Sequence, residues 1–321
     1  MAIRHLGYAC ICMSLGKSVS TNRSTVLRTF SIERASSLAL SNAQDLKKIL
    51  EWNTKNGIKF FRISSTLFPF MTHESVGYDF KELPLHVQIA KALKDAGTVA
   101  RKHGIRLNSH PGPFTILASP NKKVVDATIR DLEMHSLVAD LIDNDESETP
   151  FNINFHMGSD YGDKKEAAKR YVENLDRLSP AARKRVSVEN DDKGKLFSVR
   201  DLHELIYQKS GVPIVFDVHH HQFCTGGMKD VDASKLALKT WGKGVPEIHY
   251  SESRTIHNST LEKDEKIRPT AHSDYITGRI PDYDGTFDVM VECKAKDLAI
   301  LKYRSKYFAY DVPDECCGAI V

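Results

Sequence analysis

The stretch Val212-Pro213-Ile214-Val215-Phe216-Asp217-Val218-His219-His220-His221 is a short apolar run that ends in one carboxylate and three imidazoles. A run of β-branched and aromatic residues after a proline is typical of a fully buried strand, so its last residues lie where that strand leaves the core. Asp217 and His220 follow so closely that both can turn toward one point. Carboxylate and imidazole together suit a divalent metal ion. A surface histidine tract, or a core histidine bonded to backbone, explains this stretch alone equally well.

Other apolar runs of the chain end in the same kind of residue. We expect eight strands, at Ile3–Ile11, Ile58–Ile63, Ile105–Leu107, Phe151–Phe155, Val186–Val188, Ile214–Phe216, Val245–Ile248 and Phe287–Val291. Six of them run into residues of the types that bind metal ions, namely Asn108-Ser109-His110, His156, Glu189-Asn190-Asp191, Asp217 with His220, His249 and Glu292. One such residue at a strand end is more often structural, but six in one chain indicate a common site.

Amphipathic segments alternate with these runs. We expect helices at Asn42–Asn56, Leu83–His103, Lys122–Leu141, Lys164–Leu178, Ser198–Lys209, Ala233–Trp241 and near Lys294–Phe308. Such alternation predicts an α/β fold, the (β/α)₈ TIM barrel, in which the C-terminal ends of the strands converge on one face and would form the metal site. An open doubly wound sheet is the competing architecture, but it gathers ligands only at its switch point. The seventh crossover, Ser251–Thr286, shows no clear helix, and its residues 268–272 should return His272 to the same face.

Composition is compatible with this fold. The chain has 321 residues, 41% hydrophobic and 27% charged, which is typical of a soluble globular protein and a normal length for one TIM barrel. No run approaches the roughly 18 apolar residues of a membrane span, and no signal-peptide layout is present, so we expect a single intracellular, soluble domain over residues 1–321 with no membrane partner. A net charge of +3 permits binding to nucleic acid without identifying it. The cysteines do not have the spacing of a disulfide framework, so we expect free thiols at Cys10, Cys12, Cys224, Cys293, Cys316 and Cys317.

Motifs through nearly the whole chain carry a family resemblance. They are Leu6-Gly7-Tyr8, Thr21-Asn22-Arg23, Phe61-Arg62-Ile63-Ser64-Ser65, Phe68-Pro69-Phe70-Met71-Thr72-His73, His110-Pro111-Gly112, His156-Met157-Gly158, Tyr161-Gly162-Asp163-Lys164, Glu189-Asn190-Asp191, Val215-Phe216-Asp217, His219-His220-His221, Ile248-His249-Tyr250-Ser251 and Asp288-Val289-Met290-Val291-Glu292. In this order, on these predicted strand ends, they resemble the UV damage endonucleases. That family is similar to endonuclease IV and, more remotely, to xylose-isomerase-type sugar isomerases, all of them metal-dependent barrels.

The resemblance implies a site for up to three divalent ions, manganese or zinc. The first ion would be held by His110, His156 and Glu189, the second by Glu189, Asp217, His249 and Glu292, and the third by His220 and His272. The residues of the first two groups would be the catalytic ones. Eight such side chains also exceed what a single ion takes. His73 and Glu247 are further candidates for metal or phosphate, Glu247 standing where the family has Lys.

The implied reaction is hydrolysis of the phosphodiester immediately 5′ of a cyclobutane pyrimidine dimer or a 6-4 photoproduct in double-stranded DNA, leaving 3′-hydroxyl and 5′-phosphate. Two ions about 3.5 to 4 Å apart could span the attacking and leaving oxygens. The candidate contacts to DNA or the lesion are Tyr8, Asn22, Arg23, Pro113 and Phe114, and Arg62 is one candidate contact to phosphate. Pro113 replaces a family Gln and Cys12 a family Asn, which leaves the lesion range open.

Three other functions remain compatible with the sequence. An apurinic endonuclease of the endonuclease IV kind would cut 5′ of an abasic site with the same ions. A metal-dependent sugar isomerase would need a Lys or His acid/base beside a sugar and no groove for DNA. A metal-dependent DNA-binding protein without catalysis fits least, because every expected strand keeps its ligand. We expect a monomer in each case.

Overall fold

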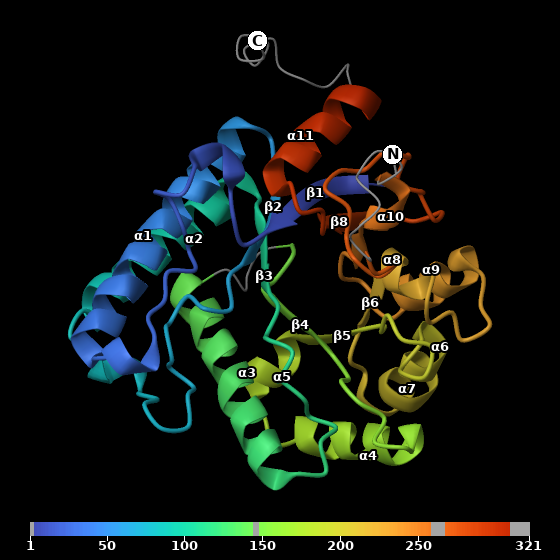
Figure 1. The fold of residues 1–321 in the computed structure, drawn as a ribbon, viewed down its shortest axis with the longest axis horizontal. Helices are drawn as coiled ribbons and strands as arrows, with labels where there is room; N and C mark the ends of the chain where they lie inside the picture. Colours follow the sequence, from blue (N-terminus) through green and yellow to red (C-terminus); the bar gives the residue numbers. More distant parts are fainter. Residues whose placement is uncertain (1–2, 144–147, 258–266, 309–321) are drawn as a thin grey trace.

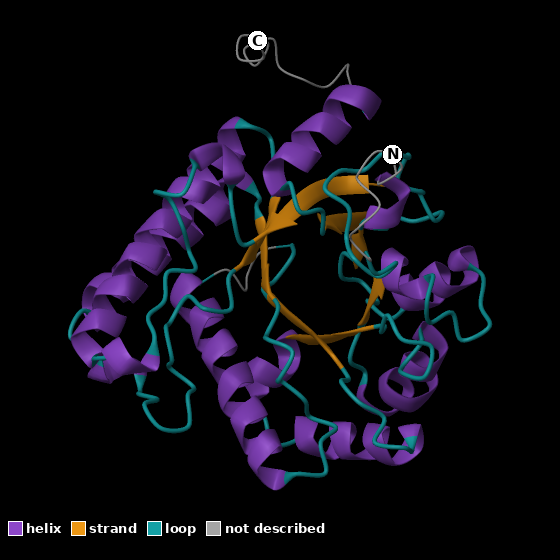
Figure 2. Ribbon diagram, viewed as in Figure 1, coloured by secondary structure: helices purple, strands orange, loops and turns teal. Residues whose placement is uncertain are grey.

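Eight parallel strands form a closed barrel in which each strand pairs with the next along the chain and β8 pairs with β1 (Figures 1 and 2). The computed structural model describes residues 3–143, 148–257 and 267–308. The strands are β1 Ile3–Ala9, β2 Phe60–Ile63, β3 Arg106–Ser109, β4 Asn152–His156, β5 Val186–Glu189, β6 Ile214–Asp217, β7 Glu247–Tyr250 and β8 Phe287–Val291. This architecture confirms the predicted TIM barrel.

Helices surround the barrel, as the purple ring around the orange strands in Figure 2 shows. They are α1 Ile32–Lys55, α2 His86–His103, α3 Lys122–Ile142, α4 Lys164–Leu175, α5 Pro180–Arg185, α6 Val199–Leu202, α7 Gln208–Ser210, α8 Val218–His221, α9 Asp230–Lys239, α10 Arg254–His257 and α11 Lys296–Tyr307. A π-helical stretch, His203–Tyr207, joins α6 to α7, and short 3₁₀ turns lie at Met13–Leu15, Leu27–Thr29 and Phe80–Glu82.

Local capping explains where elements differ from the predicted ranges. Helix α1 begins well before Asn42 because the Ser31 side chain accepts a hydrogen bond from the Arg34 amide and caps it. Helix α5, which was not predicted, begins with a capping Ser179 and Pro180 in its first turn. Strand β1 stops at Ala9 because Cys10 has a φ of 68°, which ends the extended conformation.

The described part of the seventh crossover returns the chain to the end of β7, as predicted. Ser253 and His272 form an antiparallel bridge there. This bridge brings His272 beside the other strand-end residues. Only the short helix α10 occurs in the described residues of this crossover.

The barrel interior is largely polar, with a small apolar cluster of Ala9, Phe60 and Met290, unlike the layers of branched apolar side chains that fill many TIM barrels. Arg106 on β3 lies 3.1 Å from Glu247 on β7 and 3.1 Å from Asp288 on β8, and all three are at most 1% exposed. Arg4 on β1 adds a second cation on Asp288, at 3.0 Å. Side chains of alternate strand positions, such as Ile248, instead face the surrounding helices in the main apolar core. Charged side chains therefore lie in the barrel interior as well as at the strand ends.

Two expectations concern features outside the barrel. In the described parts of the chain, no helix is both long and apolar enough to cross a bilayer. Cys10, Cys12, Cys224 and Cys293 are free thiols, as expected. Cys316 and Cys317 lie outside the described residues.

Candidate metal centre

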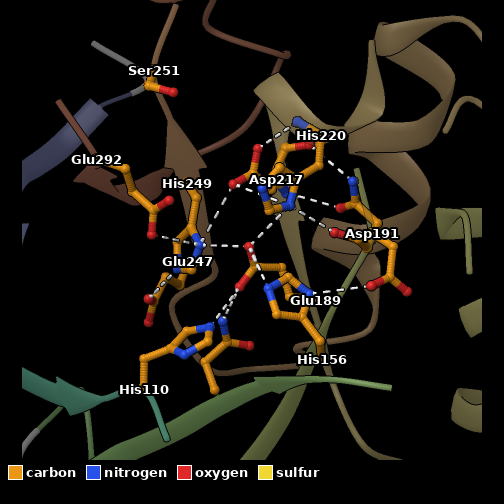
Figure 3. Close-up of polar contacts among 12 residues, drawn as sticks. His110, His156, Glu189, Asp191, Asp217, His220, Glu247, His249, Ser251 and Glu292 are labelled. Carbon is orange, nitrogen blue, oxygen red and sulfur yellow. Dashed lines mark hydrogen bonds and ion pairs between the residues drawn. The ribbon is translucent and has the colours of Figure 1, made fainter. Parts of the chain in front are cut away.

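Two groups of potential metal ligands meet at one carboxylate, that of Glu189 (Figure 3). His110, His156 and Glu189 form the first group, and Glu189, Asp217 and His249 the second; within each, one ligand atom per residue lies within 4.8 Å of the others. The strand register produces this arrangement, because His156 pairs with Glu189 and Asp217 pairs with His249 on neighbouring strands. The resemblance implied the same shared position for Glu189.

Glu189 is 1% exposed and lies between three imidazoles. Its Oε2 lies 3.3 Å from His110 Nε2, and its Oε1 lies 3.1 Å from His249 Nδ1 and 3.8 Å from His156 Nε2. Asn154 Nδ2 donates to Oε2 at 2.5 Å and orients the carboxylate. Burial opposes ionisation, but His249 and His156 outweigh it and hold the pKa of Glu189 well below its usual range. The group is therefore an ionised carboxylate with both oxygens directed at ligands.

Asp217 belongs to the second group, and the predicted ligand Glu292 lies beside it. Asp217 Oδ1 caps α8 by accepting from the His220 amide at 2.8 Å, and Oδ2 lies 3.8 Å from His249 Nδ1. Burial, and then the nearby charge of Glu189, raise the pKa of Asp217 to about 7. Glu292 Oε1 lies 3.4 Å from His249 Nδ1. Its pKa is lowered, because Arg62 and His249 outweigh the effect of burial.

His249 provides the test of whether these residues fit a metal ion. Its Nδ1 is buried and has no hydrogen-bond partner, although carboxylates of Glu189, Glu292 and Asp217 surround it. Burial would lower the pKa of His249, yet the charge of Glu189 raises it to about 10. The carboxylates thus favour positive charge at this point, which a divalent cation would supply while using the imidazole lone pair. The donor set fits a metal ion.

The third predicted ion has weaker geometric support. His220 Nδ1 lies 3.0 Å from the Asn190 carbonyl and 3.3 Å from Glu189 Oε1. His272 Nδ1 lies 2.6 Å from Ser251 Oγ, and the two imidazole rings are 6.2 Å apart. Within the described residues these two histidines are close neighbours but form no third group of three ligands. A third ion stays a prediction.

A groove of about 530 Å³ opens beside the first ligand group. Its lining includes His110, Pro113, His156, Ser159, Lys193 and His220. Asp191 also lines it, 3.6 Å from His156 Nδ1, and burial raises the pKa of Asp191 to about 7. The ligands are thus reachable from solvent through loops that follow β3, β4 and β5.

Of the DNA candidates, Pro113 lines this groove and Phe114 follows it directly in the chain. Both are exposed, and Phe114 is 86% exposed, which is far more than a core aromatic. An aromatic ring held out to solvent beside a site has no packing role. These two residues stay candidates for contact with bases.

Tyr8 faces away from the two ligand groups in this structure, and its contact with DNA stays a prediction. It is fully buried, its hydroxyl donates to Asn53 Oδ1 on α1 at 2.8 Å, and its ring packs edge-on against Phe61. Strand β1 ends in a sharp turn just after it, and the side chain falls on the outward face of the barrel. Tyr8 joins β1 to α1.

The other two DNA candidates lie in the loop after β1. Asn22 is exposed, and its side chain contacts only Ser20 among the described residues. Arg23 bonds Asp45 at 2.5 Å and the carbonyl of Ser18 at 2.6 Å. The guanidinium of Arg23 therefore holds its own loop while staying partly exposed, and both Asn22 and Arg23 stay candidates for contact with DNA.

His73 and Glu247 lie outside both ligand groups. His73 Nδ1 accepts from the Ser75 amide at 3.1 Å in the loop after β2. Glu247 is 0% exposed and faces the barrel interior beneath His249. The structure therefore brings neither into the groups as a metal ligand.

Three residues contact the ligands in ways that were not predicted, and one of them, Asn154, was not a candidate at all. Arg62, considered only for phosphate, contacts Glu292 at 2.6 Å, Asn154 bonds Glu189, and Glu247 contacts His249. The period of two along a strand was the available signal. Asn154 and Glu247 each stand two positions before a predicted ligand and so share its face.

The chain matches a known protein family over nearly its whole length. The family model described as UV-endonuclease UvdE matches residues 4–321. The chain belongs to this family. Among curated relatives, the UV-damage endonuclease of Schizosaccharomyces pombe is 34% identical over 96% of this chain, and the UV DNA damage endonuclease of Clostridium perfringens is 31% identical over 92% of it. The chain spans 51% and 69% of their lengths, respectively, so it covers about half of the first.

A solved member of the family has the same fold. The crystal structure of SacUVDE is 30% identical, with a TM-score of 0.81 over 96% of this chain and 99% of that one. The resemblance found in the motifs is thereby confirmed, both for the family and for the barrel.

Proposed function

We propose that this chain is a metal-dependent DNA endonuclease that hydrolyses the phosphodiester immediately 5′ of a UV photoproduct in double-stranded DNA. The observation that carries the proposal is the pair of ligand groups that share Glu189 at the C-terminal ends of the strands, in a chain of the UV-endonuclease family. The closed barrel from β1 to β8 supports one endonuclease domain. The products would be a 3′-hydroxyl and a 5′-phosphate.

The two ligand groups support two of the proposed ion sites. His110, His156 and Glu189 would hold one ion, Glu189 with Asp217, His249 and Glu292 a second, and His220 with His272 a third. Bound divalent ions, manganese or zinc, would activate the attacking water and stabilise the departing 3′-oxygen. Asn154 fixes the shared carboxylate of Glu189, and Arg62 balances the charge of Glu292 from inside the barrel.

Recognition of damage would fall to the loops around the groove. Pro113 lines the groove and the adjacent Phe114 is exposed, so both would meet bases displaced from a kinked duplex. A damaged, poorly stacked base pair costs less to open than an intact one, so a protein that imposes a kink selects the lesion. The exposed Phe114 ring would stack in the gap.

Cleavage of end-labelled duplexes tests this proposal. Each duplex carries one cyclobutane dimer, one 6-4 photoproduct, one abasic site or no lesion, and is incubated with manganese, with zinc or with chelator. We expect metal-dependent nicking 5′ of the photoproducts, with ends that a polymerase can extend. Nicking at the abasic site alone would assign the endonuclease IV activity instead. No nicking by the intact chain, together with isomerase activity on a free aldose, would overturn the nuclease.

A further inference from the structure

The two nitrogens of the His249 ring face opposite surroundings. Nδ1 faces the carboxylates of Glu189 at 3.1 Å and Glu292 at 3.4 Å (Figure 3). Nε2 points the other way, to Arg62 Nη2 at 2.7 Å and Glu247 Oε1 at 3.1 Å. The Nδ1 side is thus the side of the metal ligands.

A metal ion bound at Nδ1 determines that Nε2 carries the ring proton. A neutral imidazole that gives one nitrogen to a metal carries its proton on the other, and that N–H needs an acceptor when it is buried. Arg62 has only hydrogen-bond donors, so it cannot accept a hydrogen bond from this N–H. Among the described contacts of Nε2, Glu247 is then the acceptor.

Glu247 is itself held in place within the barrel. Asn108 Nδ2 donates to its Oε1 at 2.6 Å, and Arg106 Nη2 lies 3.1 Å from its Oε2. Glu247 and Asn108 are 0% exposed and Arg106 is 1% exposed. Arg106 supplies the countercharge that a buried carboxylate requires, and it is fixed in turn by Asp288.

We propose that Glu247 is a positioning residue that accepts a hydrogen bond from the Nε2–H of His249. This bond would direct Nδ1 to the metal ion that Glu189, Asp217 and Glu292 also bind. This assignment rests on the proposed metal centre. It explains how a carboxylate serves the site from outside both ligand groups. Arg62 keeps its contact with Glu292, and Glu247 accepts the hydrogen bond from Nε2–H.

Zinc affinity and histidine NMR of the full chain test the assignment together. In the zinc-loaded protein labelled with ¹⁵N at histidine, His249 should show a protonated Nε2 and a zinc-bound Nδ1, with the signals identified by their loss in His249→Gln. Glu247→Leu, which removes the acceptor, should weaken zinc binding about 10- to 100-fold and lose the Nε2–H signal. Glu247→Gln keeps an acceptor oxygen and should bind zinc with intermediate affinity.

Asp288→Asn is the matched control. Asp288 is equally buried and belongs to the same network through Arg106, but no described contact joins it to His249. It should lower thermal stability and leave zinc affinity within about twofold of the wild type. The assignment is overturned if Glu247→Leu keeps wild-type affinity, or if Asp288→Asn loses as much affinity as Glu247→Leu. If the wild type binds no zinc or manganese, the metal centre itself fails, and this assignment fails with it.

Discussion

Arg62 Nη1 lies 2.6 Å from Glu292 Oε1, so a buried cation from β2 contacts a carboxylate that is also a predicted metal ligand. The pair brings together β2, near the start of the chain, and the residue that follows β8, near its end. Arg62 is 7% exposed, and carboxylates of Glu189 and Glu247 also act on it. Arg62 therefore stabilises an acidic cluster that would otherwise depend wholly on metal ions.

Replacing Arg62 should make the fold depend on metal. In Arg62→Gln, the largely covered Glu292 stays beside Glu189 and Asp217 without its cation, so we expect the free energy of unfolding of the metal-free protein to fall by about 3 kcal/mol. Zinc should restore most of this loss. Thermal unfolding with chelator and with zinc measures both. Lys91→Gln, which breaks an exposed pair with Asp95, should change neither, and an equal loss with and without zinc would refute the role of Arg62.

Glu189 should bind metal for both groups at once. In Glu189→Gln the side chain keeps its shape and its bond from Asn154, but it loses the charge between the two groups. We expect loss of two bound ions and of detectable nicking, with the fold preserved. His110→Gln, which touches one group only, should lose one ion. Metal content after desalting decides the outcome, and a loss of one ion in both variants would contradict a shared Glu189.

The stability of the metal-free protein should fall as pH rises from 7 to 9. Burial would lower the pKa of both imidazoles, but Glu189 raises that of His249 to about 10, and Asp217 raises that of His220 to about 9. Unfolded histidine has a pKa near 6.5, so the folded state binds more protons in this window, and its advantage is lost as they dissociate. Zinc requires neutral rings and should bind more tightly at higher pH.

Thermal unfolding at pH 7 and pH 9, with chelator and with zinc, measures this linkage. The midpoint in chelator should decrease with pH, while the increase produced by zinc should grow. His249→Gln should remove much of the trend. An increase due to zinc that is the same at both pH values would show that these imidazoles release no protons to solvent when the metal binds.

Sequence reasoning reached the barrel and the strand-end ligands because both depend on local pattern. An apolar run that ends in His110 or Glu189 can be recognised without knowing the neighbouring strand. The contact of Arg106 with Glu247 joins β3 to β7 across the interior, and its existence depends on the tilt and register of strands that are not neighbours. The outward orientation of Tyr8, by contrast, follows from the period of two along β1, because Tyr8 shares a face with Leu6 and both lie in the main apolar core.

Substitution of Tyr8 tests whether this buried residue takes part in DNA binding. Tyr8→Phe removes the hydroxyl that bonds Asn53, so we expect a loss of about 1 to 2 kcal/mol in the free energy of unfolding. Because Tyr8 is fully buried, affinity for a photoproduct duplex should stay unchanged. Denaturant unfolding and a fluorescence binding assay measure the two effects. Weaker lesion binding without loss of stability would return Tyr8 to the DNA interface.

Phe114 should show the opposite behaviour. Its ring is 86% exposed beside the groove, so Phe114→Ala removes no core packing and should leave stability and metal content unchanged. If the ring stacks on a base, the variant loses about 1 to 3 kcal/mol of binding, which is roughly a 5- to 150-fold weaker affinity for the lesion duplex. Phe114→Tyr keeps the ring and should restore binding. Val87→Ala, at a 66% exposed apolar position on α2 that does not line the groove, should have no effect. Equal affinity for Phe114→Ala and the wild type would show that the exposed ring takes no part in holding damaged DNA.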